Sequence, residues 1–386
     1  MTADHRPPTA ERGPQPAPHV SGDPAHFEQC PEGAEPSLAG TNSFDRLRDQ
    51  ALFLVWGPPS HGPRSRVFAR ELGISRLRFV YSTTRRGWLA APLKYSYQTV
   101  KSLALLWRER PRVVFVQSPP SIAVLIVCLY CWLTGSCYVV DAHSDAFHSA
   151  YWSRPAWLHR FLARRAVTTI VTNEHFREML ESWDAHAFVL RDVPTTFPHN
   201  GHFAVHGAFN VVVVNTFAAD EPLAEVLQAA ENMEGVHLYI TGKKSRAGSR
   251  IPTQYSANVH FTDFLPDEDY YALLNAGDAV MCLTTRDHTM QRGACEALWL
   301  GKPIITSDWP LLQSYFHRGT IHVDNSAQGI HEGVAEMAQY HARYQVEIKE
   351  LQKGQMQEWH DKINSLTDLI EQSLGENRAR SEGEMG

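Results

Sequence analysis

The residues with the clearest chemical potential lie in the stretch MCLTTRDHTMQRGACEALWLGKPIITSD, which begins at Met281. Arg292 and Gly293 stand where a helix begins, and the free amide groups of a helix start attract anions. Glu296 follows one turn later, where its carboxylate can accept hydrogen bonds from sugar hydroxyls. His288 precedes them in a polar loop. These residues offer one contact for a phosphate and another for a ribose, and an ordinary surface glutamate is the alternative.

The surrounding segments follow a strand–loop–helix–strand pattern. Met281–Leu283 is an apolar run typical of a buried strand, and Ile304–Thr306 is a second one. Gly293–Leu300 has the composition of a helix, which Gly301 ends. Such units build open parallel sheets, in which ligands bind beyond the carboxyl ends of the strands. The loop Thr284–Gln291 occupies that position.

A second candidate site follows another apolar strand, in the sequence VDAHSDAF. Asp141, His143 and Asp145 lie where this strand ends. His143 is suited to act as a general base, or to bind an acceptor or its phosphate, while a neighbouring carboxylate orients its ring. Asp145 is the competing candidate for the base. The plainer interpretation is a structural histidine, because the chain contains 20 histidines.

A loop that follows the first predicted strand is a weaker candidate. It begins at Gly57, and its potential contacts are Gly57, Ser60, His61 and Gly62. Glycine and serine let the backbone approach a ligand closely, and the helix start that follows favours anions. The loop does not have the GxGxxG spacing of a dinucleotide site. A simple strand–helix turn is the alternative.

The sequence YITGKK ends a strand of the second half. Gly242 permits close approach of the backbone, and Lys243 or Lys244 is placed to neutralise a diphosphate. The alternative is a pair of solvated lysines.

Several common types of site have no matching motif in this chain. The sequence contains no P-loop, no GxSxG, no HExxH and no paired CxxC. Cys128 and Cys131 have CxxC spacing but lie on an apolar stretch without a second pair nearby, which favours buried thiols over zinc. We therefore expect no metal and no tightly bound cofactor.

The alternation of elements predicts an α/β chain of two doubly wound domains. Strand-like apolar runs alternate with helical stretches in both halves, as in parallel sheets with helices on both faces. Prolines and glycines interrupt the pattern between the halves, which predicts a linker. Two helical stretches are expected near the end, Glu347–Gln357 and Trp359–Leu374. The predicted order is a disordered Pro-rich tail, a first domain, a linker, a second domain and a helical tail, at residues 1–43, 44–191, 192–208, 209–345 and 346–386.

The charge distribution bears on binding partners. A net charge of −6 argues against a nucleic-acid partner. Between Arg64 and Arg112, however, twelve Lys and Arg residues accompany only two glutamates, and aromatic residues are interleaved with them. Such a stretch suits an anionic membrane surface or a phosphorylated lipid. A solvated basic face is the alternative.

One uncharged run, Val113–Val140, resembles a membrane segment in composition. Pro119–Pro120 and Gly135 cut it into a strand, a helix and a second strand. The helical part, residues 121–134, covers roughly 21 Å, which is short of the ~30 Å hydrocarbon core of a bilayer. A buried strand–helix–strand unit is favoured, with shallow membrane insertion as the alternative. No signal peptide is visible, which predicts a cytoplasmic protein.

Several motifs together resemble a known family. EALWLGKPII in the second half and the strand-linked glycine loop in the first resemble glycosyltransferases of the GT-B fold, over about Ala51–Glu347. A narrower likeness to the chitobiosyldiphosphodolichol β-mannosyltransferases rests on QSPPSI, YVVDAH, NTFAADEP, ITGK and FLPDEDYY, in that order. The resemblance implies two Rossmann-like domains facing a cleft. It also implies a nucleotide sugar bound mainly by the C-terminal domain and an acceptor met by the N-terminal domain.

Two departures from the family pattern are visible. Many members carry a glutamate eight positions before the one that matches Glu296, and this chain has His288 there. The basic residues that commonly hold the diphosphate after the first strand of the C-terminal domain are absent from Asn215–Pro222. Retaining chemistry often uses those groups. The departures therefore favour inverting chemistry with a base from the first domain, His143 or Asp145.

The resulting prediction is a glycosyltransferase that moves a sugar from a nucleotide-diphosphate sugar to a lipid-linked or polysaccharide-precursor acceptor. It is expected at the inner, cytoplasmic face of the membrane as a peripheral protein, with the nucleotide sugar as co-substrate. Glu296 would contact the ribose, while Arg292 and Lys243 would contact the diphosphate. Two alternatives stay open. One is a nucleotide-sugar epimerase of the same fold, and the other is a non-catalytic, membrane-associated partner subunit of a glycosyltransferase.

Overall fold

The computed structural model describes residues 47–58, 63–82, 91–143, 145–148, 155–195, 197 and 201–383. The predicted disordered tail, residues 1–43, lies outside the described residues, and so do Ser60, His61 and Gly62.

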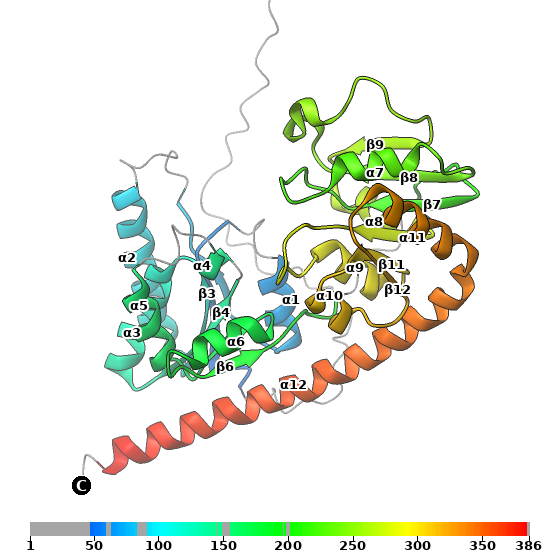
Figure 1. The fold of residues 1–386 in the computed structure, drawn as a ribbon. Helices are drawn as coiled ribbons and strands as arrows, with labels where there is room; N and C mark the ends of the chain where they lie inside the picture. Colours follow the sequence, from blue (N-terminus) through cyan, green and yellow to red (C-terminus); the bar gives the residue numbers. More distant parts are fainter. Residues whose placement is uncertain are drawn as a thin grey trace, which may run out of the picture. The chain divides into compact units, whose positions relative to one another are not determined.

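The first half of the chain forms a six-stranded parallel sheet with the strand order β2-β1-β3-β4-β5-β6 (Figure 1). Its strands are β1 Ala51–Val55, β2 Leu77–Phe79, β3 Val113–Ser118, β4 Cys137–Ala142, β5 Thr168–Val171 and β6 Ala187–Val189. The helices between them are α1 Pro63–Glu71, α2 Ala91–Glu109, α3 Ser121–Thr134, α4 Asp145–His148, α5 Ala156–Arg165 and α6 Glu174–Glu181.

The second half forms another six-stranded parallel sheet, with the order β12-β11-β10-β7-β8-β9. Its strands are β7 Phe209–Val213, β8 Val236–Thr241, β9 Val259–Asp263, β10 Ala279–Cys282, β11 Ile304–Ser307 and β12 Thr320–Val323. Its helices are α7 Leu223–Ala230, α8 Asp267–Ala276, α9 Arg292–Leu300, α10 Pro310–Tyr315 and α11 Ala327–Gln339, with short 3-10 turns η3 Lys244–Arg246 and η4 Gly248–Arg250. The predicted class, two doubly wound α/β sheets, is confirmed.

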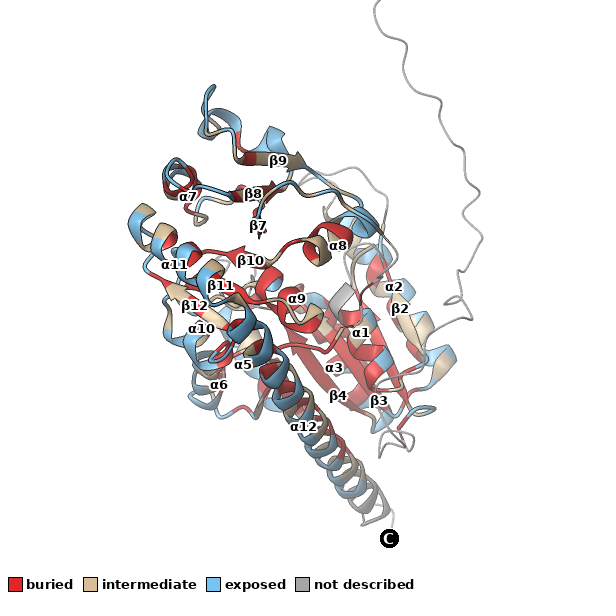
Figure 2. Cartoon of the chain, turned by 90° about the vertical axis from the view of Figure 1, so that its right-hand side faces the viewer, coloured by how far each residue is buried: buried red, intermediate tan, exposed pale blue. Residues whose placement is uncertain are grey.

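The central strands of each sheet are covered on both faces, which explains why they are almost continuously apolar. Strand β1 has the sequence ALFLV and is buried throughout. Leu52 and Leu54 pack into one core of the first sheet, while Ala51 and Phe53 pack into the core on the opposite face. The second sheet is likewise sandwiched between two cores, and Figure 2 shows the central strand β10 and most of helix α9 as buried.

The uncharged run Val113–Val140 folds as the predicted strand–helix–strand unit, β3–α3–β4. Helix α3 ends at Gly135, which has the left-handed φ of 72° typical of a helix C-cap. Among the described residues, no helix combines the length and the apolar character needed to cross a bilayer.

The C-terminal segment differs from the expectation of two short helices. It is one continuous helix, α12 His341–Gly383, which runs through Gly354 and Gly375 (Figure 1). Ile348 and Leu351 pack into a core of the second sheet. Further along, Trp359, Ile363, Leu366 and Ile370 pack into a core of the first sheet. Burial of this apolar stripe along the helix outweighs the weak helix propensity of its two glycines.

Candidate functional site

The strand order of each sheet reverses at one point, and ligands of open α/β sheets bind beyond the carboxyl ends of the strands there. In the first sheet this switch point lies between β1 and β3, and in the second sheet it lies between β7 and β10. The loops of interest in the second sheet are therefore Val214–Pro222 after β7 and Leu283–Gln291 after β10. The second loop belongs to the predicted ligand-binding stretch and leads into α9, which carries Arg292, Gly293 and Glu296.

The two loops at the second switch point are tied together through Asp220. The hydroxyl of Thr284 donates to Asp220 Oδ2 over 2.8 Å, and the amide of Thr285 donates to the Asp220 carbonyl over 2.8 Å. The guanidinium of Arg286 lies 3.5 Å from Asp220 Oδ1, and its side chain is two-thirds exposed. Sequence reasoning missed these contacts, because the partners are 64 residues apart.

Thr284 is the fully buried centre of a wider polar network. Its amide donates to Ser307 Oγ over 2.8 Å, and its carbonyl accepts from Trp309 Nε1 and Asn325 Nδ2 over 2.9 and 3.1 Å. Ser307 Oγ donates to Asn325 Oδ1 over 2.6 Å. The ends of β10, β11 and β12 are thereby joined by satisfied hydrogen bonds, which gives the site a rigid floor. The available sequence signal was a polar residue directly after each apolar strand.

Gly242, after β8, is required by its surroundings. Its φ is +103°, and a Cβ atom there would lie 2.1 Å from the carbonyl oxygen of Asn215. The close approach predicted for this glycine is therefore an approach to the loop after β7. Lys243 follows at the exposed edge, and the amide of Lys244 donates to Asp263 Oδ1 over 2.9 Å. The amides of Lys244 and Phe264 lower the pKa of Asp263.

A carboxylate of the chain itself occupies amide groups of the loop after β7. Glu221 accepts hydrogen bonds from the amides of Thr216 and Ala218, at 3.0 Å and 2.8 Å, and from the Thr216 hydroxyl at 3.0 Å. Converging backbone amides are a common anion site. In this chain an internal anion fills that site.

Helix α9 begins at Arg292 and is packed tightly against the sheet. A Cβ atom on Gly293 would lie 2.7 Å from both Cys282 Sγ and Val214 Cγ1. Only glycine lets the helix start approach the ends of β7 and β10 so closely. The amide groups of the first turn are thereby held at the switch point, as the predicted anion contact requires.

Glu296 is buried on α9, with both carboxylate oxygens engaged. The hydroxyl of Tyr270 donates to Oε2 over 2.8 Å, and Arg292 Nε donates to Oε1 over 2.9 Å. Burial and the Glu296 charge raise the pKa of Tyr270 well above its usual value, so Tyr270 is a neutral donor. Each oxygen keeps capacity for a further hydrogen bond, since a carboxylate offers about four acceptor positions.

Arg292 lies between two carboxylates. Its guanidinium is 3.8 Å from Asp192 Oδ1 as well as paired with Glu296, and its side chain is 42% exposed. Burial alone would lower the pKa of Arg292, but Asp192 and Glu296 raise it above its usual value. Asp192 also accepts from Trp299 Nε1 over 2.8 Å. The guanidinium is therefore fixed and charge-compensated, with its remaining donors open to a ligand.

His288 has a left-handed φ of +54° in the loop after β10. Its ring stacks on His175 with the centroids 4.5 Å apart, and its carbonyl accepts from Asn173 Nδ2 over 3.3 Å. Asn173 in turn caps α6 through the amide of Phe176. These contacts bring His288 to the loop after β5. They do not test its predicted role in donor binding.

At the end of β4 the structure brings His143 and Asp141 together. His143 Nε2 lies 3.6 Å from Asp141 Oδ2, with the carboxylate fully buried and the imidazole about one-third exposed. The amide of His143 donates to the Ser118 carbonyl over 2.9 Å, which holds the strand end in place. Asp145 opens the short helix α4, and its side chain lies outside the described part of the structure. A Cβ atom on Gly57 would meet nothing within 4 Å, so packing does not require that glycine.

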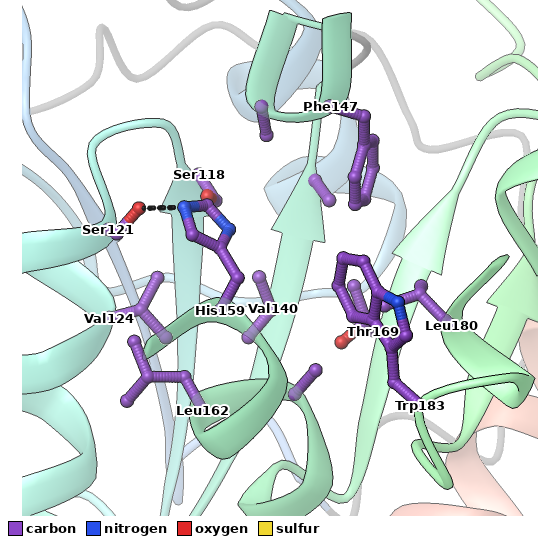
Figure 3. A pocket seen from close by; sticks show the side chains of 13 residues that line it. Ser118, Ser121, Val124, Val140, Phe147, His159, Leu162, Thr169, Leu180 and Trp183 are labelled. Atoms are coloured by element: carbon purple, nitrogen blue, oxygen red, sulfur yellow. Dashed lines mark hydrogen bonds between the residues drawn. The ribbon is translucent and has the colours of Figure 1, made fainter. Parts of the chain in front are cut away.

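A small cavity lies beneath this strand end (Figure 3). Its volume is about 30 Å³, which is room for one or two waters and not for a sugar. Ser121 Oγ and His159 Nε2 form a 2.7 Å hydrogen bond in its wall. The other lining residues are mainly apolar, among them Val124, Val140, Phe147, Leu162 and Trp183.

The described cysteines do not form a metal site. Cys128, Cys131, Cys137, Cys282 and Cys295 are buried and free, and burial raises the pKa of Cys137 to about 12. Among the described residues, no group of three or more His, Cys, Asp or Glu side chains is arranged to hold a metal ion.

Comparison with known proteins gives matches over both sheets. Residues 42–194 match a family model described as a glycosyl transferase 4-like domain, and residues 221–363 match one described as glycosyl transferase-like. A chitobiosyldiphosphodolichol beta-mannosyltransferase from Pongo abelii is 24% identical over 228 residues, which cover 55% of this chain and 46% of that protein. The chain thus spans about half the length of the curated relatives that it matches.

Two solved structures share the fold. The Anabaena protein HepE in complex with UDP and glucose has a TM-score of 0.59 at 14% identity, covering 84% of this chain and 99% of that one. A sucrose-phosphate synthase from Thermosynechococcus elongatus has a TM-score of 0.58 at 13% identity, covering 84% and 98%. At this level of identity the likeness concerns the fold alone.

Proposed function

We propose that this chain, which belongs to the glycosyltransferases of the GT-B fold, transfers a sugar from a nucleoside diphosphate to a lipid-linked or polysaccharide-precursor acceptor. The observation that carries the proposal is the succession of two glycosyl transferase models over two doubly wound sheets. The carboxylates and cations described above lie at the strand ends of these sheets, where such folds bind their ligands.

On the donor side, we assign the ribose to Glu296. Its carboxylate is held by Tyr270 and Arg292, and a fixed acceptor loses little freedom when a hydroxyl binds. The diphosphate would meet the first amides of α9 at Gly293, the open donors of Arg292, and Lys243. These groups can carry the charge of the leaving diphosphate without a metal ion.

On the acceptor side, we assign the general base to His143. Because its Nε2 faces Asp141, Nδ1 is the atom left to accept a proton. The acceptor oxygen would attack the anomeric carbon while the bond to the diphosphate breaks. His143 would take the proton of the attacking hydroxyl, and Asp141 would stabilise the imidazolium that forms. This sequence is an inverting displacement.

The acceptor class is inferred from the relatives. Their name, chitobiosyldiphosphodolichol beta-mannosyltransferase, describes transfer to a sugar on a lipid carrier. A lipid-linked acceptor would place this chain at the cytoplasmic face of a membrane as a peripheral protein.

A non-catalytic partner subunit is the second candidate, and Glu221 favours it. This carboxylate fills amides that would otherwise be open to a diphosphate at the second switch point. Such a subunit would bind no nucleotide.

One experiment separates these functions. The full chain is screened by thermal unfolding with UDP, GDP, ADP, CDP and the corresponding nucleotide sugars. A nucleotide at 100 times its dissociation constant should stabilise the protein by about 2.7 kcal/mol. The best nucleotide sugar is then assayed for nucleoside diphosphate release with and without a membrane lipid extract. A transferase should release nucleoside diphosphate only when the extract supplies an acceptor. An epimerase should yield free nucleoside diphosphate or an altered sugar without the extract. If no nucleotide stabilises the chain, the proposed function is wrong.

A further inference from the structure

Helix α2 presents its apolar stripe to the solvent. Four large apolar side chains on it are 48–67% exposed, namely Leu93, Tyr97, Val100 and Trp107. They are four, three and seven residues apart, so they share one face of the helix. The buried face carries two polar residues beside Leu106: Gln98 donates to the Val80 carbonyl, and Ser102 accepts from Trp56 Nε1. An ordinary surface helix turns its apolar stripe to the core, whereas α2 exposes a second apolar stripe to solvent.

Helices α3 and α5 continue the same arrangement. On α3, Ile122, Leu129, Trp132 and Leu133 are exposed at helical spacing, with Trp132 at 73%. On α5, Trp157 is 69% exposed and Phe161 is 42% exposed one turn later. The opposite sides of all three helices contribute to one core of the first sheet, through residues such as Leu106, Val127 and Leu162. Among the described residues, their outer sides are largely exposed, although the ring of Trp107 packs edge-on against Tyr130 of α3.

The three helices lie next to one another on the same side of the first sheet (Figure 1), and α3 contacts both of the others. Of the fifteen large apolar side chains that are exposed among the described residues, ten lie on α2, α3 and α5. Scattered single exposures are normal in soluble proteins, whereas such a concentration marks an interaction surface. We call it the α2–α3–α5 face.

The face carries a strongly positive border. The three helices contain six cations and a single acid, Glu109, which is mostly buried. The cations are Lys94, Lys101, Arg108, Arg160, Arg164 and Arg165, of which Arg108 pairs with Glu109 and Arg164 with Asp184. Lys101 and Arg165 lie over the rings of Tyr97 and Phe161, at 5.6 and 4.7 Å from the ring centroids. Exposed aromatic and aliphatic side chains bordered by Lys and Arg match the interface of an anionic bilayer.

We propose that the α2–α3–α5 face docks on an anionic phospholipid bilayer. Its apolar side chains enter the headgroup region, while the cations at its border pair with lipid phosphates. The proposal deepens the proposed function, since it names the surface that would bring the enzyme to a lipid-linked acceptor. The proposal assigns membrane binding to this face and not to the whole basic stretch Arg64–Arg112, because that stretch is divided among α1, β2 and α2. Arg76 and Arg78 in it are occupied by Glu109.

The test is vesicle co-sedimentation of the full chain. The vesicles are phosphatidylcholine with one-third phosphatidylglycerol, and pure phosphatidylcholine is the comparison. The wild-type chain should bind the anionic vesicles, and binding should weaken in high salt. The double variant Trp132→Ser/Leu133→Ser should bind about 100-fold more weakly, at about tenfold for each buried apolar side chain. Lys101→Gln/Arg160→Gln should lose about fivefold for each charge on anionic vesicles only.

The matched control is Val346→Ser on α12, since Val346 is as exposed as Leu133 (59% against 63%) but lies outside the face. It should bind vesicles like the wild type. Circular dichroism confirms that each variant is folded, and thermal stabilisation by the best nucleotide reports the donor site separately. Vesicle binding that persists in the Trp132/Leu133 variant would overturn the proposal. So would an absence of wild-type vesicle binding together with self-association in sedimentation velocity that the same variant abolishes, because the face would then bind a second copy.

Discussion

The substitution Glu296→Gln tests the donor site most directly. It removes the negative charge that faces Arg292 and keeps the size of the side chain. If Glu296 accepts hydrogen bonds from ribose hydroxyls, the variant loses a charged acceptor in a buried position. A hydrogen bond to a charged group contributes roughly 1.5–3 kcal/mol. The nucleotide should therefore bind roughly 10- to 150-fold more weakly.

The variant also disturbs the protein itself, and the structure indicates how to separate the two effects. Tyr270→Phe removes the 2.8 Å hydrogen bond to Glu296 while leaving the carboxylate charge in place. It should lower the free energy of unfolding by about 1 kcal/mol and leave nucleotide affinity within a few-fold of wild type. Glu234→Gln, at an exposed position, changes the net charge equally and should change neither quantity.

The ligand is the nucleoside diphosphate that stabilises the wild type most. Isothermal titration calorimetry gives its dissociation constant for each variant, and urea denaturation without ligand gives the free energy of unfolding. The expected pattern is a large loss of affinity in Glu296→Gln alone. A folded Glu296→Gln variant with the wild-type dissociation constant would refute the ribose assignment. Equal losses in Tyr270→Phe and Glu296→Gln would show that the carboxylate acts only through the packing of α8 on α9.

Three further changes have definite expected outcomes. His143→Ala should lower turnover by about 10²–10⁴ with donor affinity unchanged by calorimetry, and equal losses in both would contradict its role as the base. Gly242→Ala should destabilise the chain by at least ~1–3 kcal/mol, because its φ and the nearby Asn215 carbonyl exclude a Cβ; Gly57→Ala, in open space, is the control in the same urea titration. Burial raises the pKa of Glu71 above 4.5 against the opposing Arg70 charge, so the native state holds this proton more tightly than the unfolded state. Stability should then fall as pH rises from about 4.5 through the raised pKa, and Glu71→Gln should reduce that fall.

The two parallel sheets could be predicted from the sequence because their central strands are buried on both faces. The run Val113–Val140 shows why, since its prolines and Gly135 mark the only places where the chain can turn between apolar segments. The sequence pattern does not show that helix α2 exposes an apolar stripe to solvent. The spacing of Leu93, Tyr97 and Val100 indicates a helix, but it would be the same whether these residues faced the core or the solvent. Only the burial of Gln98 and its bond to the Val80 carbonyl show that the apolar stripe is outside.

The candidate site was predictable where partners are close in sequence. Arg292 and Glu296 are four residues apart, and Asp141 and His143 share a strand end. The partners that fix these groups were not predictable in the same way. Asp192 is 107 residues from Trp299, and the sequence pattern assigned it only to a linker. Long-range polar pairs carry no periodic signal, so composition and spacing do not reveal them.

The loop after β7 contains no lysine or arginine of its own, and charged side chains of the chain itself contact its backbone. Glu221 already satisfies the amides of Thr216 and Ala218, and Arg250 donates to the carbonyls of Phe217 and Ala218 from the other side. Glu221 and Arg250 therefore satisfy the amides and carbonyls of this loop. A diphosphate at this switch point would meet the Glu221 carboxylate and be repelled, unless it lies nearer to α9 and the loop after β8. That is where Arg292, the Gly293 amide and Lys243 stand. The position of the Glu221 carboxylate thus agrees with the proposed donor site on α9 and disfavours one on the loop after β7.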